Sequence, residues 1–273
     1  MHRCDCVGVD LTPPAFIGIL TPPNAFMTTS HTSHPTESSS SSRFRVARAW
    51  LVHLYTALGN IAAFCALIAI IDHQPRDVFI WLVVAIFIDS TDGVLARIWD
   101  VARWTPHFDG RKLDDITDYL TYVFIPMFFA YEYGLVTGWG NIALGVVLLA
   151  AAFGFCQDWA KTEDGFFTGF PNYWNIVVLY LYWLQLPVDV NALILMVLAF
   201  LVFVPIKYVY ATKTRFWRPG TLALGAVWGV LLIALLMDFE SPDPWLVWAS
   251  FFYPVYYTAL SFYLHFGRRP TTR

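Results

Sequence analysis

Of the 273 residues in this chain, 58% are hydrophobic and only 14% are charged, which is too much apolar side chain for a soluble core. A net charge of −3 also argues against a nucleic-acid partner. The composition therefore predicts a protein whose surroundings are a lipid bilayer.

The N-terminal segment, residues 1–46, is rich in Pro, Ser and Thr and ends in a serine run at 38–42. Such a composition cannot bury enough apolar surface to fold, so we expect a disordered cytoplasmic tail. Residues 47–267 are predicted to form one transmembrane domain, and residues 268–273 a short basic cytoplasmic C-terminus.

Long apolar runs follow one another from Trp50 onward. The predicted runs are 49–71, 78–98, 115–136, 139–158, 172–187, 191–211, 221–237 and 244–266. Roughly 20 helical residues cross a hydrocarbon core of about 30 Å, and open strands would leave backbone groups unpaired there. The expected fold is an all-α, polytopic integral membrane bundle of about eight transmembrane helices.

The distribution of Lys and Arg predicts the orientation of these helices. With the N-terminus in the cytoplasm, eight crossings place all 17 Lys and Arg residues on the cytoplasmic side except Arg76. The predicted outer loops carry acidic residues instead, namely Asp72, Asp77, Asp189, Asp238, Glu240 and Asp243. Both termini are therefore expected to be cytoplasmic.

Acidic residues gather where the second run ends and the third begins. Helical spacing puts five residues of the second run on one face: Asp89, Asp92, Gly93, Ala96 and Arg97. Asp114 and Asp118 form an i, i+4 pair at the start of the third run, so two neighbouring helices can turn four carboxylates toward each other. Helix capping and snorkelling of the arginine are the structural alternative.

Four carboxylates at a membrane boundary repel one another unless cations neutralise them. Oxygen ligands suit Mg²⁺ or Mn²⁺, and two such ions can clamp the attacking and leaving oxygens of a phosphoryl transfer. Gly93 and Ala96 leave room for a bulky ligand, and the Arg97 guanidinium can grip a phosphate. The pattern predicts a two-metal phosphotransfer site.

Read together with Gly110, this pattern resembles the signature of the CDP-alcohol phosphatidyltransferases, Asp-x-x-Asp-Gly-x-x-Ala-Arg followed by Gly-x-x-x-Asp-x-x-x-Asp. Twelve residues separate Arg97 from Gly110, a longer gap than is usual in that family. This gap, the segment 113–123 and the segment 166–175 resemble the bacterial phosphatidylcholine synthase branch. The resemblance covers about residues 46–266.

The resemblance implies transfer of the phosphatidyl group of CDP-diacylglycerol to free choline, giving phosphatidylcholine and CMP. Asp89, Asp92, Asp114 and Asp118 would hold two Mn²⁺ or Mg²⁺ ions, with Asp118 also the general base. The residues expected to bind CDP-diacylglycerol are Gly93, Ala96, Arg97, Gly110 and Lys161. A bacterial inner-membrane location, an active site on the cytoplasmic side and a homodimer are further implications.

Choline carries a quaternary ammonium, which aromatic faces attract. The candidate aromatic residues are Tyr119, Tyr122, Tyr173 and Trp174, although packing is an alternative role for each. His53, Thr56 and Asn60 form a polar stripe on the first run that either contacts substrate or links helices.

Two other functions remain open from the residues. The acceptor could be serine, inositol or glycerol phosphate, or the acidic cluster could be the cation site of a transporter. The chain shows no internal repeat of the kind that many transporters carry, which favours the enzyme.

Overall fold

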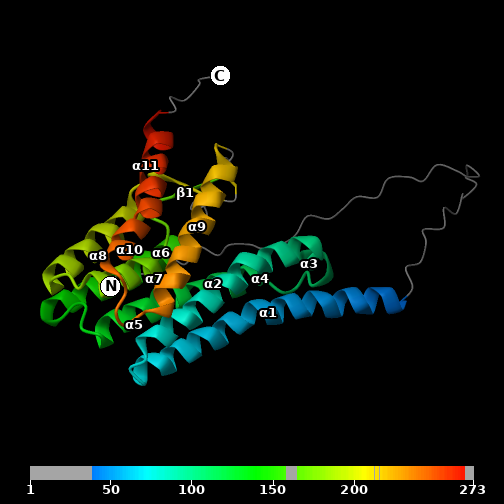
Figure 1. The fold of residues 1–273 in the computed structure, drawn as a ribbon. Helices are drawn as coiled ribbons and strands as arrows, with labels where there is room; N and C mark the ends of the chain where they lie inside the picture. Colours follow the sequence, from blue (N-terminus) through cyan, green and yellow to red (C-terminus); the bar gives the residue numbers. More distant parts are fainter. Residues whose placement is uncertain (1–38, 158–164, 212, 215, 268–273) are drawn as a thin grey trace, which may run out of the picture. The chain divides into compact units, whose positions relative to one another are not determined.

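The computed structural model describes residues 39–157, 165–211, 213–214 and 216–267, and all of them belong to one unit that begins at Ser39. Figure 1 shows this unit as an assembly of helices, with one short pair of strands among the described residues. The expectation of an all-α membrane protein is confirmed at this level.

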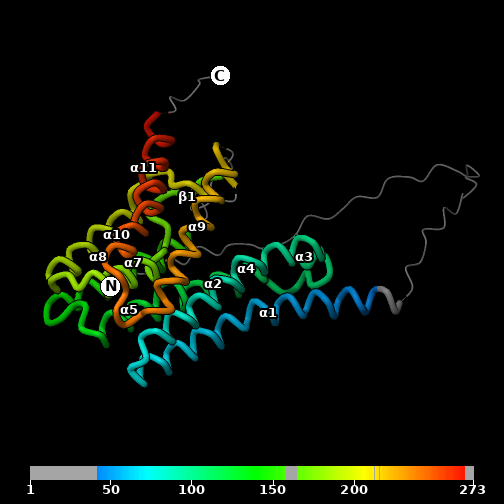
Figure 2. Tube along the Cα trace, viewed as in Figure 1, coloured from blue at the N-terminus to red at the C-terminus, as the bar shows by residue number. Residues whose placement is uncertain are grey.

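Two long antiparallel helices, α1 (Ser39–Ile71) and α2 (Pro75–Ile98), pack along each other (Figure 2). Pro75 stands in the first turn of α2, where its missing N–H leaves no bond unmade. Small side chains on α1 are buried among its neighbours, namely Ala62, Ala63, Ala66 and Ala69. The first two predicted runs are thus helices. Because α1 begins at Ser39, residues 39–46 are helical and the prediction of disorder was wrong for them.

The third run is helical but not regular. The short helix α3 (Val101–Trp104) leads to α4 (Gly110–Asp118), a π-helical segment η1 (Tyr119–Phe124) and α5 (Ile125–Glu132), which follow one another without a break. Within this stretch the Ile125 N–H donates to the Leu120 carbonyl, an i→i−5 bond. Pro126 has no N–H and its ring crowds the carbonyl four residues before it, which is the physical reason for a wider turn here.

Asp109 caps α4. Its carboxylate accepts hydrogen bonds from the backbone N–H groups of Arg111 (3.2 Å) and Lys112 (3.3 Å). The bond from Lys112 is the main reason that the pKa of Asp109 lies below its ordinary value. This cap fixes where the helix carrying Asp114 and Asp118 begins, five residues before the predicted start of that run.

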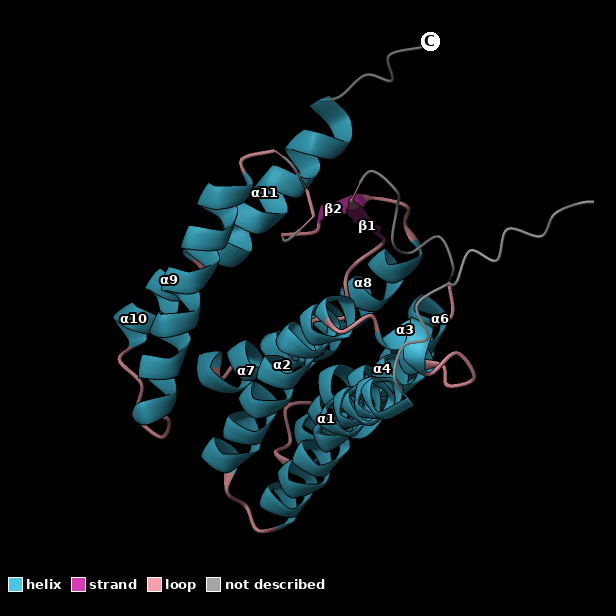
Figure 3. Cartoon of the chain, turned by 90° about the vertical axis from the view of Figure 1, so that its right-hand side faces the viewer, coloured by secondary structure: helices cyan, strands magenta, loops and turns pink. Residues whose placement is uncertain are grey.

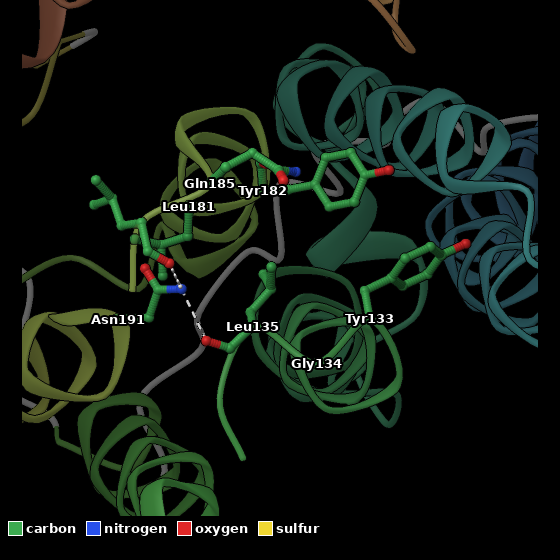
Figure 4. A pocket seen from close by; sticks show the side chains of 8 residues that line it. Tyr133, Gly134, Leu135, Leu181, Tyr182, Gln185 and Asn191 are labelled. Atoms are coloured by element: carbon green, nitrogen blue, oxygen red, sulfur yellow. Dashed lines mark hydrogen bonds between the residues drawn. The ribbon is translucent and has the colours of Figure 1, made fainter. Parts of the chain in front are cut away.

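The middle of the chain forms η2 (Gly138–Gly140), α6 (Asn141–Phe155), α7 (Trp174–Leu184) and α8 (Val188–Phe203). Asn191 on α8 is buried, and its amide N–H groups donate to the carbonyls of Leu135 (2.8 Å) and Leu186 (3.4 Å). Figure 4 shows this amide joining two loops, while the rings of Tyr133 and Tyr182 point away from it. Asn191 therefore ties together the ends of three helices.

The sixth predicted run does not remain helical to its end. α8 stops at Phe203, because Val204 has an extended backbone before Pro205. Two strands that were not predicted from the sequence lie in this part of the fold. Strand β1 (Phe166–Thr168) pairs antiparallel with β2 (Lys207–Val209). The prediction of helix over 204–211 was wrong.

The strand pair is held by the last helix. The hydroxyl of Ser261 accepts a hydrogen bond from the Val209 N–H (3.0 Å), and His265 Nδ1 accepts one from the Lys207 N–H (3.2 Å). These side chains satisfy β2 backbone groups that face away from β1, which is why so short a strand can exist.

The last three helices are α9 (Arg218–Met237), α10 (Pro244–Ser250) and α11 (Phe252–Gly267), with α10 and α11 making up the eighth run. Figure 3 shows α9 alongside α11. The buried hydroxyl of Tyr180 on α7 bonds Ser250 (2.8 Å) and accepts from Trp228 Nε1 (3.0 Å), which links α7 to α10 and α9.

Four helices in the described residues are long and apolar enough to cross a bilayer: Ser42–Ile71, Pro75–Ile98, Gly138–Phe155 and Arg218–Met237. Two shorter apolar helices are Trp174–Leu184 and Val188–Phe203. Large apolar side chains lie exposed along α1, including Leu51, Leu54, Leu58, Ile61 and Phe64. Such a surface is stable against lipid and not against water.

Candidate active site

Three carboxylates meet between α2 and α4. Asp89 comes from α2, and Asp114 and Asp118 lie one turn apart on α4. One oxygen from each lies within 4.8 Å of the other two, and all three residues are half-buried. The i, i+4 spacing on α4 and the packing of both helices against α1 produce this arrangement.

Asp92 stands one turn beyond Asp89 on the same helix but faces α1. It is buried, with 5% of its surface exposed, and accepts a 2.7 Å hydrogen bond from the hydroxyl of Thr56. Asp92 is not among the three carboxylates that come within 4.8 Å of one another. The structure therefore brings three of the four predicted aspartates together and sets Asp92 beside them.

The polar stripe of α1 links helices. His53 Nε2 lies 2.9 Å from Thr105 Oγ1, Thr56 donates to Asp92, and the Asn60 amide donates to Thr117 Oγ1 at 3.1 Å. Each bond reaches a different segment of the chain: the loop after α3, then α2, then α4. Of the two roles left open by the sequence, these contacts support helix linking.

Two glycines allow α4 to approach α1 closely. A Cβ on Gly59 would strike Thr117 Cγ2, and a Cβ on Gly110 would lie 2.9 Å from His53 Cε1. Gly110 was predicted to bind substrate, and in the structure it packs against His53. Because α1 holds both α2 and α4, it sets the separation of Asp89 from Asp114 and Asp118.

The remaining predicted nucleotide-binding residues lie along the last turns of α2. A Cβ on Gly93 would meet only the guanidinium of Arg97, at 3.4 Å, and Arg97 itself is exposed. Ala96 packs against the small cluster of Ala49, Val52 and Val101. Lys161 lies outside the described residues.

The four aromatic candidates have different surroundings. Tyr119 donates its hydroxyl to the Leu148 carbonyl (3.0 Å), whereas Tyr122 donates to Asp89 Oδ2 (2.7 Å). Tyr173 keeps 39% of its surface exposed, with its ring centroid 6.2 Å from that of Tyr257. Trp174 is fully buried in the core, and its indole N–H donates to Asn172 (3.0 Å). Trp174 thus has no surface to offer a ligand.

The three-carboxylate cluster fits a divalent cation by its chemistry. Its donors are all oxygen, which Mg²⁺ and Mn²⁺ prefer. Like charges this close, in a half-buried place, repel one another unless a cation or a proton compensates them. The cluster can therefore hold a metal ion.

Comparison with known proteins gives the family. No protein-family model matches the chain. The phosphatidylcholine synthase of Pseudomonas aeruginosa is 41% identical over 192 residues, which cover 68% of this chain and 81% of that protein. The chain belongs to the phosphatidylcholine synthase family.

Two further phosphatidylcholine synthases agree with this assignment. The protein of Rhizobium meliloti is 36% identical over 202 residues, covering 73% of this chain and 83% of its own length. That of Legionella pneumophila is 36% identical over 223 residues, covering 79% and 88% respectively. The resemblance to the bacterial phosphatidylcholine synthase branch of the CDP-alcohol phosphatidyltransferases is confirmed.

Two hydrogen-bond partners of the carboxylates in this phosphatidylcholine synthase family member were not predicted from the sequence. Thr56 was considered only as part of a stripe, and Tyr122 only as an aromatic face for choline. A signal existed for Tyr122, which stands four residues after Asp118 and hence near its helical face. No comparable signal pairs Thr56 with Asp92, because they lie on different helices.

Proposed function

We propose that this chain transfers the phosphatidyl group of CDP-diacylglycerol to choline, giving phosphatidylcholine and CMP. The observation that carries the proposal is the cluster of Asp89, Asp114 and Asp118, found in a chain of the phosphatidylcholine synthase family. This cluster supplies the acidic groups that a phosphoryl transfer needs.

Two divalent ions, Mn²⁺ or Mg²⁺, are part of this proposal. Asp89, Asp114 and Asp118 would hold them, with Asp92 contributing from its place beside the cluster. When bound, such ions neutralise the charge that develops on phosphate oxygens during transfer.

Asp118 is proposed as the general base. The choline hydroxyl gives its proton to the Asp118 carboxylate while its oxygen forms a bond to the phosphorus that bears diacylglycerol. The bond from that phosphorus to the CMP oxygen breaks, and CMP leaves with the electron pair. A hydroxyl is a poor nucleophile at neutral pH, so a positioned carboxylate lowers the barrier.

Gly93 and Arg97 are proposed to receive the nucleotide and its phosphates. Gly93 leaves open space on its face of α2 apart from the Arg97 guanidinium, so a phosphate can approach the backbone and meet the arginine together. Ala96 adds a small side chain to the same stretch, Gly110 keeps α4 close to His53, and Lys161 is proposed as a further phosphate contact.

The choline ammonium is proposed to lie against aromatic rings. Tyr173 has the exposed ring surface that this role requires, and the ring of Tyr122 lies next to the carboxylates. The hydroxyl of Tyr119 is bonded to the Leu148 carbonyl and Trp174 is fully buried, so these two residues would support the pocket without presenting a ring to choline.

We further propose that the chain crosses the bacterial inner membrane eight times, with both termini and the carboxylates on the cytoplasmic side. We also propose that the chain assembles as a homodimer and divides into an N-terminal segment over 1–46, a transmembrane domain over 47–267 and a C-terminus over 268–273. The helix α1 begins at Ser39, within the first of these segments. Labelling single introduced cysteines with a membrane-impermeant reagent tests the topology. Residues 72 and 240 should react from outside, whereas residues 107 and 213 should not.

The reaction is tested with purified protein, labelled choline, CDP-diacylglycerol and Mn²⁺, with and without EDTA. Labelled phosphatidylcholine and CMP in equal amounts, abolished by EDTA, are expected. Metal-dependent CMP release with serine, inositol or glycerol phosphate, but not with choline, would overturn the acceptor. Absence of CMP release with every acceptor would overturn the transfer itself.

A further inference from the structure

Tyr122 reaches from the π-helical segment η1 to a carboxylate on a different helix. Its hydroxyl donates a 2.7 Å hydrogen bond to Oδ2 of Asp89 on α2. π-helical turns are rare and often occur at functional sites. The irregular turn places this tyrosine directly against the three-carboxylate cluster.

A carboxylate held through one oxygen does not rotate freely about its Cβ–Cγ bond. The lone pairs of Asp89 that the tyrosine leaves unused keep a fixed direction as a result. Metal-binding carboxylates generally depend on such outer hydrogen bonds for their orientation and affinity.

We propose that Tyr122 is a positioning residue that orients Asp89 for divalent-cation binding. The inference rests on the proposed function, because it assumes that the carboxylate cluster holds a metal. In this inference the tyrosine hydroxyl increases the affinity of the site for the metal ion and does not take part in binding choline.

The two roles of Tyr122 give different kinetic results. A choline contact would act through the ring face, which Tyr122→Phe preserves. A positioning role acts through the hydroxyl, which Tyr122→Phe removes. The phenylalanine variant therefore isolates the hydroxyl bond to Asp89 from the aromatic surface.

The test measures Mn²⁺ binding directly, by electron paramagnetic resonance of the full chain in lipid nanodiscs, without substrate. Tyr122→Phe is expected to bind Mn²⁺ about 10–100-fold more weakly than wild type. The Mn²⁺ concentration for half-maximal activity should rise by the same factor. The KM for choline at saturating Mn²⁺ should stay unchanged.

Tyr119→Phe is the matched control. It removes a tyrosine hydroxyl from the same π-helical segment, but this hydroxyl donates to the Leu148 carbonyl (3.0 Å) and not to a carboxylate. Mn²⁺ binding by this variant should equal that of wild type. Equal weakening in both variants would show that any damage to the segment loosens the site, and would overturn the inference.

Three other results separate the possible failures. Wild-type protein that binds no Mn²⁺ would overturn the proposed metal site, and the inference with it. Wild-type binding that Tyr122→Phe leaves unchanged would overturn the inference alone. Unchanged Mn²⁺ binding with a raised KM for choline would assign the hydroxyl to the acceptor pocket instead.

Discussion

The hydroxyl of Thr56 on α1 donates a 2.7 Å hydrogen bond to the buried carboxylate of Asp92 on α2. The same hydroxyl lies 3.3 Å from the Val52 carbonyl of its own helix, so the bond to Asp92 is the closer one. A carboxylate with 5% of its surface exposed depends on such a donor.

Replacing Thr56 by Val keeps the shape of the side chain and removes this donor. We expect a loss of stability of about 1–3 kcal/mol, because a buried acceptor then loses its partner. Transfer activity should fall as well, since Asp92 adjoins the metal-binding cluster. Thermal unfolding in detergent and the turnover rate measure the two effects.

Thr91→Val is the control for this change. It removes a hydrogen bond between the same two helices, the one that joins the hydroxyls of Thr91 and Tyr55 (2.8 Å), but involves no carboxylate. Its activity should stay close to wild type. A Thr56 variant as active as the Thr91 variant would contradict the importance of the bond to Asp92.

Gly59→Ala should separate α1 from α4, because the new Cβ would collide with Thr117 Cγ2. Overpacking of this kind costs about 1–3 kcal/mol. Adding Thr117→Ser should restore stability, since serine lacks the methyl group and keeps the hydroxyl that accepts from Asn60. The free energy of unfolding of the single and double variants measures both effects.

Gly145→Ala serves as the comparison, because a Cβ at this position on α6 meets nothing within 4 Å. It should be neutral or stabilising, as alanine favours helix over glycine by about 1 kcal/mol. Equal destabilisation at residues 59 and 145 would show that the helix contact is unimportant.

Asp118→Asn should abolish transfer while the protein still inserts and folds, because the amide cannot accept the choline proton. The neighbouring Asp115→Asn should retain activity, since Asp115 is not among the three carboxylates within 4.8 Å of one another. Labelled choline transfer at saturating Mn²⁺ distinguishes the two. Turnover by the Asp118 variant would remove its assignment as base.

We predict that the stability of the protein depends on pH through the ionisation of Asp109. Its pKa is lowered in the folded protein, mainly by the hydrogen bond from the Lys112 N–H. The ionised cap therefore stabilises α4 above the ordinary aspartate pKa of about 3.9 and loses this contribution as pH falls through the lowered value. Asp109→Asn keeps a capping oxygen without the charge.

The unfolding temperatures of wild type and Asp109→Asn should thus differ at neutral pH and converge in acid. A difference that is the same at pH 7 and below pH 3 would show that the charge of Asp109 does not contribute.

Much of the helical fold could be predicted from the apolar runs, because lipid permits few other backbone structures. The ends of the runs were harder to predict. Residues 204–211 continue an apolar run yet leave the helix before Pro205, and β2 depends on Ser261 and His265, which are distant in sequence. No local sequence pattern predicts a contact between residues so far apart in the chain.

The candidate site shows the same division. Asp89, Asp114 and Asp118 could be placed together, since helical spacing and neighbouring helices suffice for that. The orientation of the Asp92 side chain could not be predicted, because it depends on a hydrogen bond from Thr56 on another helix. The packing role of Gly110 likewise depends on His53, a partner that only the three-dimensional arrangement identifies.

The π-helical turn at Tyr119–Phe124 also bears on how this helix tolerates changes of length. Such a turn accommodates one residue more than a regular helix of the same course. Removing a residue there would let the turn relax into ordinary α-helix, with the helices on either side keeping their faces. A one-residue deletion in this segment should therefore leave folding and membrane insertion intact while moving Tyr122 away from Asp89. The extra residue of the π-helical turn is thus needed for the active site and not for the fold.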